Sequence, residues 1–127
     1  MLKALIAGAA FLAISYPAHA VGQCQKPSPV NVPANAAQMS VAEFKGIYEQ
    51  GQTYMSGADA YLTCLNQIIY TTAPEDPIVS AAGKAHQDYA SEWGPVWGEL
   101  NLACIEWEVA HGDTFPGGCQ PPSPSQN

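Results

Sequence analysis

The 127-residue sequence contains no arginine, and its four lysines oppose eleven carboxylates, which gives a formal net charge of −7 at pH 7. Binding to nucleic acid needs a basic patch that neutralises phosphates, and bidentate recognition of phosphate or carboxylate ligands uses the guanidinium group. We therefore expect no nucleic acid, nucleotide or anionic membrane surface among the partners of this chain.

Short motifs for catalysis and metal binding are also missing. There is no C-x-x-C pair, and His86 and His111 lie apart, whereas zinc and copper sites use converging His and Cys ligands at short spacing. Glu92, Glu99 and Glu106 repeat at sevenfold spacing, which is typical of a solvated helix face. General acid–base catalysis instead uses carboxylates in different environments around one cleft. We predict no enzyme activity, no catalytic residues, no metal site and no cofactor.

The first twenty residues, MLKALIAGAAFLAISYPAHA, combine one lysine with an uncharged run and end in small residues around His19. This pattern is typical of a secretory signal peptide with an A-x-A cleavage site. The apolar run is shorter than the roughly 20 residues that span a bilayer. We expect a periplasmic or secreted chain, residues 21–127, that has no membrane contact after cleavage and keeps three lysines against eleven carboxylates, a net charge of −8.

An extended arm and a first helix are predicted next. Residues 21–39 are rich in proline and poor in charge, which favours an extended arm. Ser40 and Glu43 form a capping-box pattern, which predicts a helix over about 40–70. Its apolar residues recur every three or four positions, as in a seam for one partner helix, and a second apolar line lies beside the seam. The seam is Val41, Phe44, Tyr48, Gly51, Met55, Ala58, Leu62, Leu65 and Ile69, and the second line is Ile47, Tyr54, Tyr61 and Ile68.

A second helix is predicted over about 76–111, after the break TTAPEDP, with Thr72 or Asp76 as its N-cap. The missing amide donor at Gly94-Pro95 predicts a kink. Residues 112–127 are predicted to be a C-terminal loop and disordered tail. The fold class is all-α, a long antiparallel helical hairpin with a proline-rich N-terminal arm. The second seam is Ile78, Ala82, Ala85, Tyr89, Trp93, Val96, Leu100, Ala103, Trp107 and Ala110.

The four cysteines predict two disulfides, because an even number in an oxidising compartment is usually paired. In an antiparallel hairpin, Cys104 lies about 20 residues, or roughly 30 Å, along the return helix from the level of Cys64. A disulfide needs α-carbons within about 7 Å. Cys119 does not reach Cys64 either, because the few residues after His111 cannot run back along most of the hairpin. The predicted pairs are therefore Cys24–Cys64 and Cys104–Cys119. If Gly94-Pro95 reverses the chain instead, three helices form and Cys104 could meet Cys64.

A resemblance rests on three segments, CQKPSPVNVP, FKGIYEQG and YLTCL, followed by a second amphipathic helix. Together they resemble a family of small exported, functionally uncharacterised helical proteins of Gram-negative bacteria, with a Cys-x-x-Pro arm and a Tyr-x-x-Cys-Leu sequence. Over about Cys24 to Val109 the resemblance implies a periplasmic helical hairpin with the arm cysteine bridged to the first-helix cysteine. It implies no activity. The chain departs from the pattern in Cys104, Cys119 and Gly94-Pro95.

Four aromatic residues of the second helix, Tyr89, Trp93, Trp97 and Trp107, gather around the predicted kink. Aromatic residues at helical spacing usually fill a core, but a kink can also open a cleft for apolar ligands. One hypothesis is therefore a carrier or sensor of a small apolar ligand that binds these four residues.

The favoured hypothesis is a non-catalytic periplasmic interaction or scaffold protein, a class that includes inhibitors, chaperones and immunity-like binders. Two helices make a thin core, so an apolar flank needs cover from the C-terminal loop or another chain. The expected partner is another protein or a second copy in a homodimer. An exposed apolar patch on the monomer would favour this hypothesis, and an enclosed pocket would favour the ligand carrier.

Export should remove residues 1–20. The intact mass of protein purified from the periplasm should match residues 21–127, and sequencing from its N-terminus should begin at Val21. A purified chain that still begins at Met1 would contradict the predicted cleavage.

Overall fold

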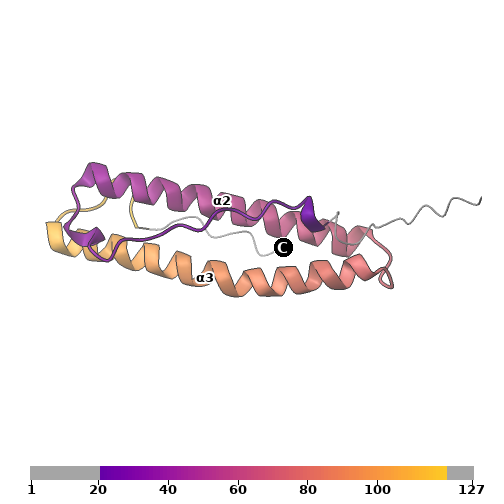
Figure 1. Ribbon diagram of the computed structural model, residues 1–127. Coiled ribbons are helices and arrows are strands. Elements are labelled where there is room, and N and C mark those ends of the chain that lie inside the picture. Colours follow the sequence, from indigo (N-terminus) through magenta and orange to yellow (C-terminus); the bar gives the residue numbers. More distant parts are fainter. Residues whose placement is uncertain (1–20, 120–127) are drawn as a thin grey trace, which may run out of the picture.

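The computed structural model describes residues 21–119, so the predicted signal peptide and the predicted disordered tail lie outside the described residues. A short 3-10 helix, η1 (Ala36–Gln38), precedes two long helices, α2 (Val41–Thr71) and α3 (Pro77–His111). Figure 1 shows α2 and α3 side by side, with the extended arm lying along them. Residues 21–119 contain no β-strand. The predicted all-α helical hairpin is confirmed.

Both long helices begin at the caps that their sequences encode. The Ser40 side chain accepts a hydrogen bond from the Glu43 amide (3.3 Å), and the Glu43 carboxylate accepts one from the Ser40 amide (3.0 Å). Asp76, rather than Thr72, is the N-cap of α3, and its carboxylate accepts a hydrogen bond from the Ile78 amide at 3.0 Å. These bonds satisfy amides that have no partner inside the helix.

α3 continues through Pro95 without interruption. The alternative in which Gly94-Pro95 reverses the chain into a three-helix bundle is therefore wrong. In Figure 1 the α3 ribbon bows gently and stays continuous. Proline removes one helical hydrogen bond. Tyr89 before Pro95 and Leu100 after it are both buried, so α3 is packed against the core on both sides of the proline.

The core consists of two clusters along the hairpin, called here the turn-end cluster and the open-end cluster. Val41 and Ala110 were predicted in the seams but are exposed, because they lie in the outermost turns, beyond the rings of Phe44 and Trp107 that close the open end. The turn-end cluster is Cys24, Tyr54, Met55, Ala58, Tyr61, Leu62, Leu65, Ala82 and Tyr89, and the open-end cluster is Ala36, Phe44, Tyr48, Leu100, Ala103, Cys104, Trp107 and Phe115.

The arm covers the turn-end cluster and is fixed by the disulfide between Cys24 and Cys64, whose α-carbons lie 5.6 Å apart. Pro27 packs so closely on Gly57 that a β-carbon there would lie 2.8 Å from the Pro27 ring. Val30 packs against the same cluster. The arm therefore lies over the second apolar line of α2, where Tyr54 and Tyr61 need cover, and the predicted Cys24–Cys64 pairing is confirmed.

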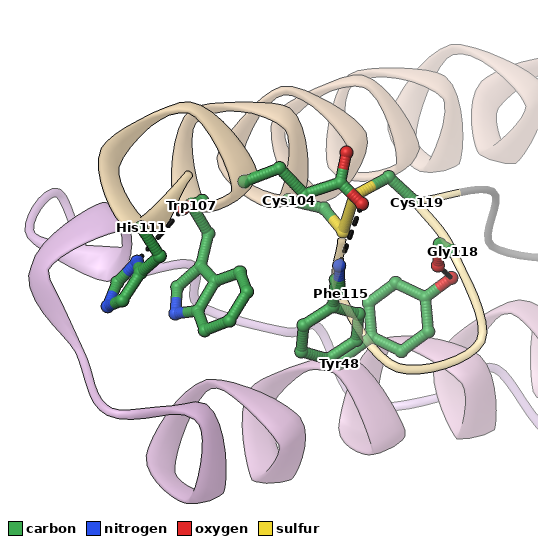
Figure 2. Close-up of a disulfide and its surroundings, with 8 residues drawn as sticks. Tyr48, Cys104, Trp107, His111, Phe115, Gly118 and Cys119 are labelled. Carbon is green, nitrogen blue, oxygen red and sulfur yellow. Dashed lines mark hydrogen bonds between the residues drawn. A yellow bond between two sulfur atoms is a disulfide. The ribbon is translucent and has the colours of Figure 1, made fainter. Parts of the chain in front are cut away.

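The loop after α3 covers the open-end cluster and is fixed by the second predicted disulfide, Cys104–Cys119, with α-carbons 5.4 Å apart. Figure 2 shows how this bond holds the Phe115 ring beneath α3. The Phe115 ring meets the Trp107 ring edge to face at 5.4 Å, and the Tyr48 hydroxyl donates to the Gly118 carbonyl oxygen at 3.1 Å. Phe115 is therefore a core residue supplied by a loop.

Loss of the Cys24–Cys64 bond should lower stability while leaving the helices in place. The bond closes a separation of 40 residues, which is worth about 3–4 kcal/mol in the entropic model. Cys24→Ser, Cys64→Ser and the double variant should lose the same stability in thermal unfolding by circular dichroism, because all three break one bond. Combining Cys24→Ser with Cys104→Ser is the control, and its losses should add. Additive losses in the Cys24/Cys64 double variant would contradict the pairing.

Close approach of the helices at Gly51 gives a second prediction. A β-carbon at Gly51 would collide with the Leu100 side chain, which is buried in the open-end cluster and would have to shift against its neighbours. Gly51→Ala should therefore destabilise the fold by about 1–3 kcal/mol. Gly83→Ala is the matched control, because nothing lies within 4 Å of its added β-carbon, and it should stabilise α3 by about 0.5–1 kcal/mol. Equal effects in urea unfolding would show that α2 and α3 do not meet at Gly51.

Candidate interaction surface

α3 carries a line of exposed apolar side chains on the face opposite its core seam. Leu102, Ile105 and Val109 are 56%, 46% and 79% exposed. Their spacing of three and four residues places them together on one helix face. Isolated exposed apolar residues are normal, whereas large ones gathered on one helix face can serve as an interaction site. We call these three residues the α3 stripe.

Two glycines continue the face of the α3 stripe toward the middle of the helix. Gly94 and Gly98 precede Leu102 at steps of four, and a β-carbon added to either glycine would meet nothing within 4 Å. The surface therefore changes from a shallow stretch at the glycines to a protruding apolar stretch at the stripe. None of these five positions carries a charge. A partner helix could approach the α3 backbone closely over the glycines.

A small hollow lies beside the stripe, between α3 and the end of the arm. Its volume is about 160 Å³. Leu102 belongs to both the stripe and this hollow, while Glu99 and Glu106 add exposed carboxylates. The hollow therefore combines apolar walls with negative charge. Its lining residues are Val32, Pro33, Ala34 and Ala36 on the arm side and Glu99, Leu102, Ala103 and Glu106 on α3.

The carboxylate row predicted as a solvated face has one member that is already paired. Lys26 of the arm forms an ion pair with Glu92 at 2.6 Å, and each side chain is 49% exposed. The hydrogen bond to Glu92 is the main cause that raises the pKa of Lys26. An exposed pair of this kind contributes about 0–1 kcal/mol. Glu99 and Glu106 have no cationic partner among residues 21–119.

The four aromatic residues predicted as a ligand site divide between the two clusters. Tyr89 belongs to the turn-end cluster, and Trp93 and Trp97 pack against it. Trp107 belongs to the open-end cluster, where its indole N–H donates to the Met39 carbonyl oxygen at 3.0 Å. Tyr89 and Trp107 are only 2% and 4% exposed. The structure therefore uses these two residues as core and does not bring all four around one cleft.

Two neighbouring side chains, Tyr61 and Lys26, lie against the Tyr89 ring. This ring meets Tyr61 edge to face at 4.9 Å, and the Lys26 ammonium lies 5.5 Å from the ring centroid. The hydroxyl is buried and has no hydrogen-bond partner of regular geometry among the described residues. Burial, with Tyr54 as a smaller cause, raises the pKa of Tyr89 far above its ordinary value. Tyr89 is therefore a packing residue of the turn-end cluster.

Two further hollows open on the surface. A groove of about 750 Å³ lies between the arm and α2 and is lined by Pro27, Ser28, Pro29, Val30, Gly46, Glu49, Gln50, Thr53, Tyr54 and Gly57. A hollow of about 350 Å³ at the open end is lined by Ser40, Val41, Trp107, His111, Asp113, Thr114 and Pro116. Each contains at most one of the four predicted aromatic residues that would hold an apolar ligand.

Within residues 21–119, no three His, Cys, Asp or Glu side chains gather closely enough to hold a metal ion. Neither long helix in this range has the length and apolar character needed to cross a bilayer. Comparison with known proteins found no matching family model, no similar curated protein and no similar solved structure. A function can therefore be inferred only from the residues of the chain itself.

The sequence predicts an uncovered apolar flank on the second helix, and the structure shows exposed apolar residues at the α3 stripe. Two of the four aromatic residues predicted as a ligand site, Tyr89 and Trp107, are core residues instead. The signal for the stripe was available: Leu102, Ile105 and Val109 follow helical spacing about half a turn away from the seam residues Leu100 and Trp107.

Proposed function

We propose that this chain is a non-catalytic periplasmic interaction protein that binds another exported protein through the α3 stripe. The observation that carries the proposal is the exposure of Leu102, Ile105 and Val109 on a helix whose opposite face supplies buried core residues. The two disulfides support an oxidising compartment. A rigid hairpin that presents one apolar face suits the class of inhibitors, chaperones and immunity-like binders.

The size of the surface fits a modest protein interface. Fully burying a leucine, isoleucine or valine side chain contributes about 1.5–3 kcal/mol. Because the stripe residues are already partly covered, we expect about 1–2 kcal/mol from each. A stable interface buries at least about 1,000 Å² in total, so the glycine stretch and the hollow beside Leu102 would have to take part. From Gly94 to Val109 this surface is roughly 22 Å long.

The alternative hypothesis, a carrier of a small apolar ligand, receives less support. A ligand site needs open space bounded by its lining residues. Tyr89 and Trp107, which that hypothesis requires, are packed against neighbouring rings.

Site-specific photo-crosslinking in cells that export the chain tests the proposal. A photoreactive amino acid placed at Leu102, Ile105 or Val109 should give a discrete crosslinked product, because these side chains would lie inside the interface. The same amino acid at Thr63 or Gln67, which are exposed on α2, should give none.

A second variant separates interface loss from unfolding. Ile105→Ser, combined with a crosslinker at Val109, should abolish the product while changing stability by no more than about 0.5 kcal/mol. A product of twice the chain's mass would identify a second copy as the partner. Equal crosslinking from the stripe and from α2, or none from the stripe, would overturn the proposed function.

A further inference from the structure

We infer that the partner of the α3 stripe is a cationic amphipathic helix, whose apolar ridge packs on the stripe and whose lysine or arginine side chains meet Glu99 and Glu106. This inference rests on the proposed function and adds the chemistry of the partner. It follows from how charge is distributed around the stripe.

The cationic side chains within residues 21–119 are already paired. They are three lysines, and these bind Glu92, Glu49 and Asp88 at 2.6, 3.8 and 2.6 Å. Glu99 and Glu106 lie beside the stripe, and neither has a hydrogen-bond donor or cation among the described residues. Two carboxylates that border an apolar surface without a counter-charge are complementary to a partner that brings positive charge.

A second copy of this chain does not meet that requirement. The exported chain would carry a net charge of −8 and no arginine, so a second copy would bring eleven more carboxylates and only three lysines, each of which lies near a carboxylate of its own chain. Pairing two α3 stripes would set acidic helices against each other, and like charges across an interface are unfavourable. The charge distribution therefore favours a different chain over a homodimer.

The arm shows how a cation binds this carboxylate row. Lys26 pairs with Glu92 while its ammonium lies over the Tyr89 ring. Glu99 and Glu106 follow Glu92 at sevenfold spacing on the same side of α3. The hollow beside them offers the apolar side chains of Val32, Pro33 and Leu102, on which the aliphatic stem of a lysine or arginine could lie.

Spacing along α3 defines the partner more closely. Seven residues correspond to about 10.5 Å of helix. A helix packed nearly parallel or antiparallel to α3 presents its own side chains at the same interval, so basic residues seven apart would reach Glu99 and Glu106 together. The open glycines at 94 and 98 allow the backbone of that helix to come close.

A synthetic peptide provides the probe. The peptide is an 18-residue helix with a leucine ridge and lysines at sevenfold spacing, and two matched peptides carry glutamine or glutamate in place of the lysines. Fluorescence anisotropy measures the Kd of each for the disulfide-intact chain 21–127. The lysine peptide should bind about tenfold more tightly than the glutamine peptide, and raising NaCl to about 0.5 M should remove most of this difference.

Charge variants locate the binding. Glu99→Gln with Glu106→Gln should weaken the lysine peptide by about tenfold and leave the glutamine peptide unchanged. Glu49→Gln with Glu75→Gln removes the same charge from exposed positions away from the stripe and should change the Kd less than twofold. Equal weakening by the two double variants would show that net charge alone attracts the peptide and would overturn the inference.

The remaining outcomes separate the two proposals. If the lysine and glutamine peptides bind equally and Ile105→Ser weakens both, the stripe is a docking surface without a cationic partner. The proposed function then stands and this inference falls. Self-association through the stripe in sedimentation velocity would identify a second copy as the partner and would overturn the inference. If no peptide binds, the inference falls, and the crosslinking experiment decides the proposed function independently.

Discussion

The structure depends on one constraint, that two antiparallel helices share a single seam and cannot cover each other's flanks. α2 has a second apolar line at Tyr54 and Tyr61, and the arm covers it because Cys24 is bonded to Cys64. At the open end the loop after α3 supplies the third layer of the core through Phe115. The Cys104–Cys119 bond fixes this loop to α3. Each disulfide thus adds a third layer of packing to a different cluster. Without these layers the two helices would leave more of their apolar surface exposed to water.

Much of this architecture could be predicted from the sequence, since it follows from local rules. Caps at Ser40 and Asp76 are short-range patterns, and the Cys24–Cys64 pairing follows from the length of the helices once the chain turns between them. The course of α3 at Pro95 could not be predicted in the same way, because it depends on packing at Tyr89 and Leu100 against α2. Phe115 was also missed as a core residue, because a single aromatic in a loop has no periodicity. The candidate surface was partly foreseeable, since helical spacing reveals the α3 stripe but not which face of the helix remains uncovered.

The same constraint explains where a partner could bind. The arm and the C-terminal loop cover flanks of the hairpin, and the outer face of α3 keeps Leu102, Ile105 and Val109 exposed after both layers are in place. Its acidic edge is the continuation of a row whose first member, Glu92, the chain pairs with its own Lys26. We therefore regard the stripe and the carboxylates beside it as one surface. On this account the buried aromatic residues and the disulfides keep α3 rigid, and the exposed face of α3 that bears the stripe binds the partner.

Hydroxyl-radical footprinting of the disulfide-intact chain, with and without the lysine peptide, tests this account most directly. It reports the solvent exposure of individual side chains, so it compares the α3 stripe with Tyr70, which is 78% exposed near the turn between the helices. The account predicts that reactivity falls at Leu102, Ile105 and Val109 and stays unchanged at Tyr70. Protection centred on Tyr70 or Trp93, with the stripe still reactive, would contradict it.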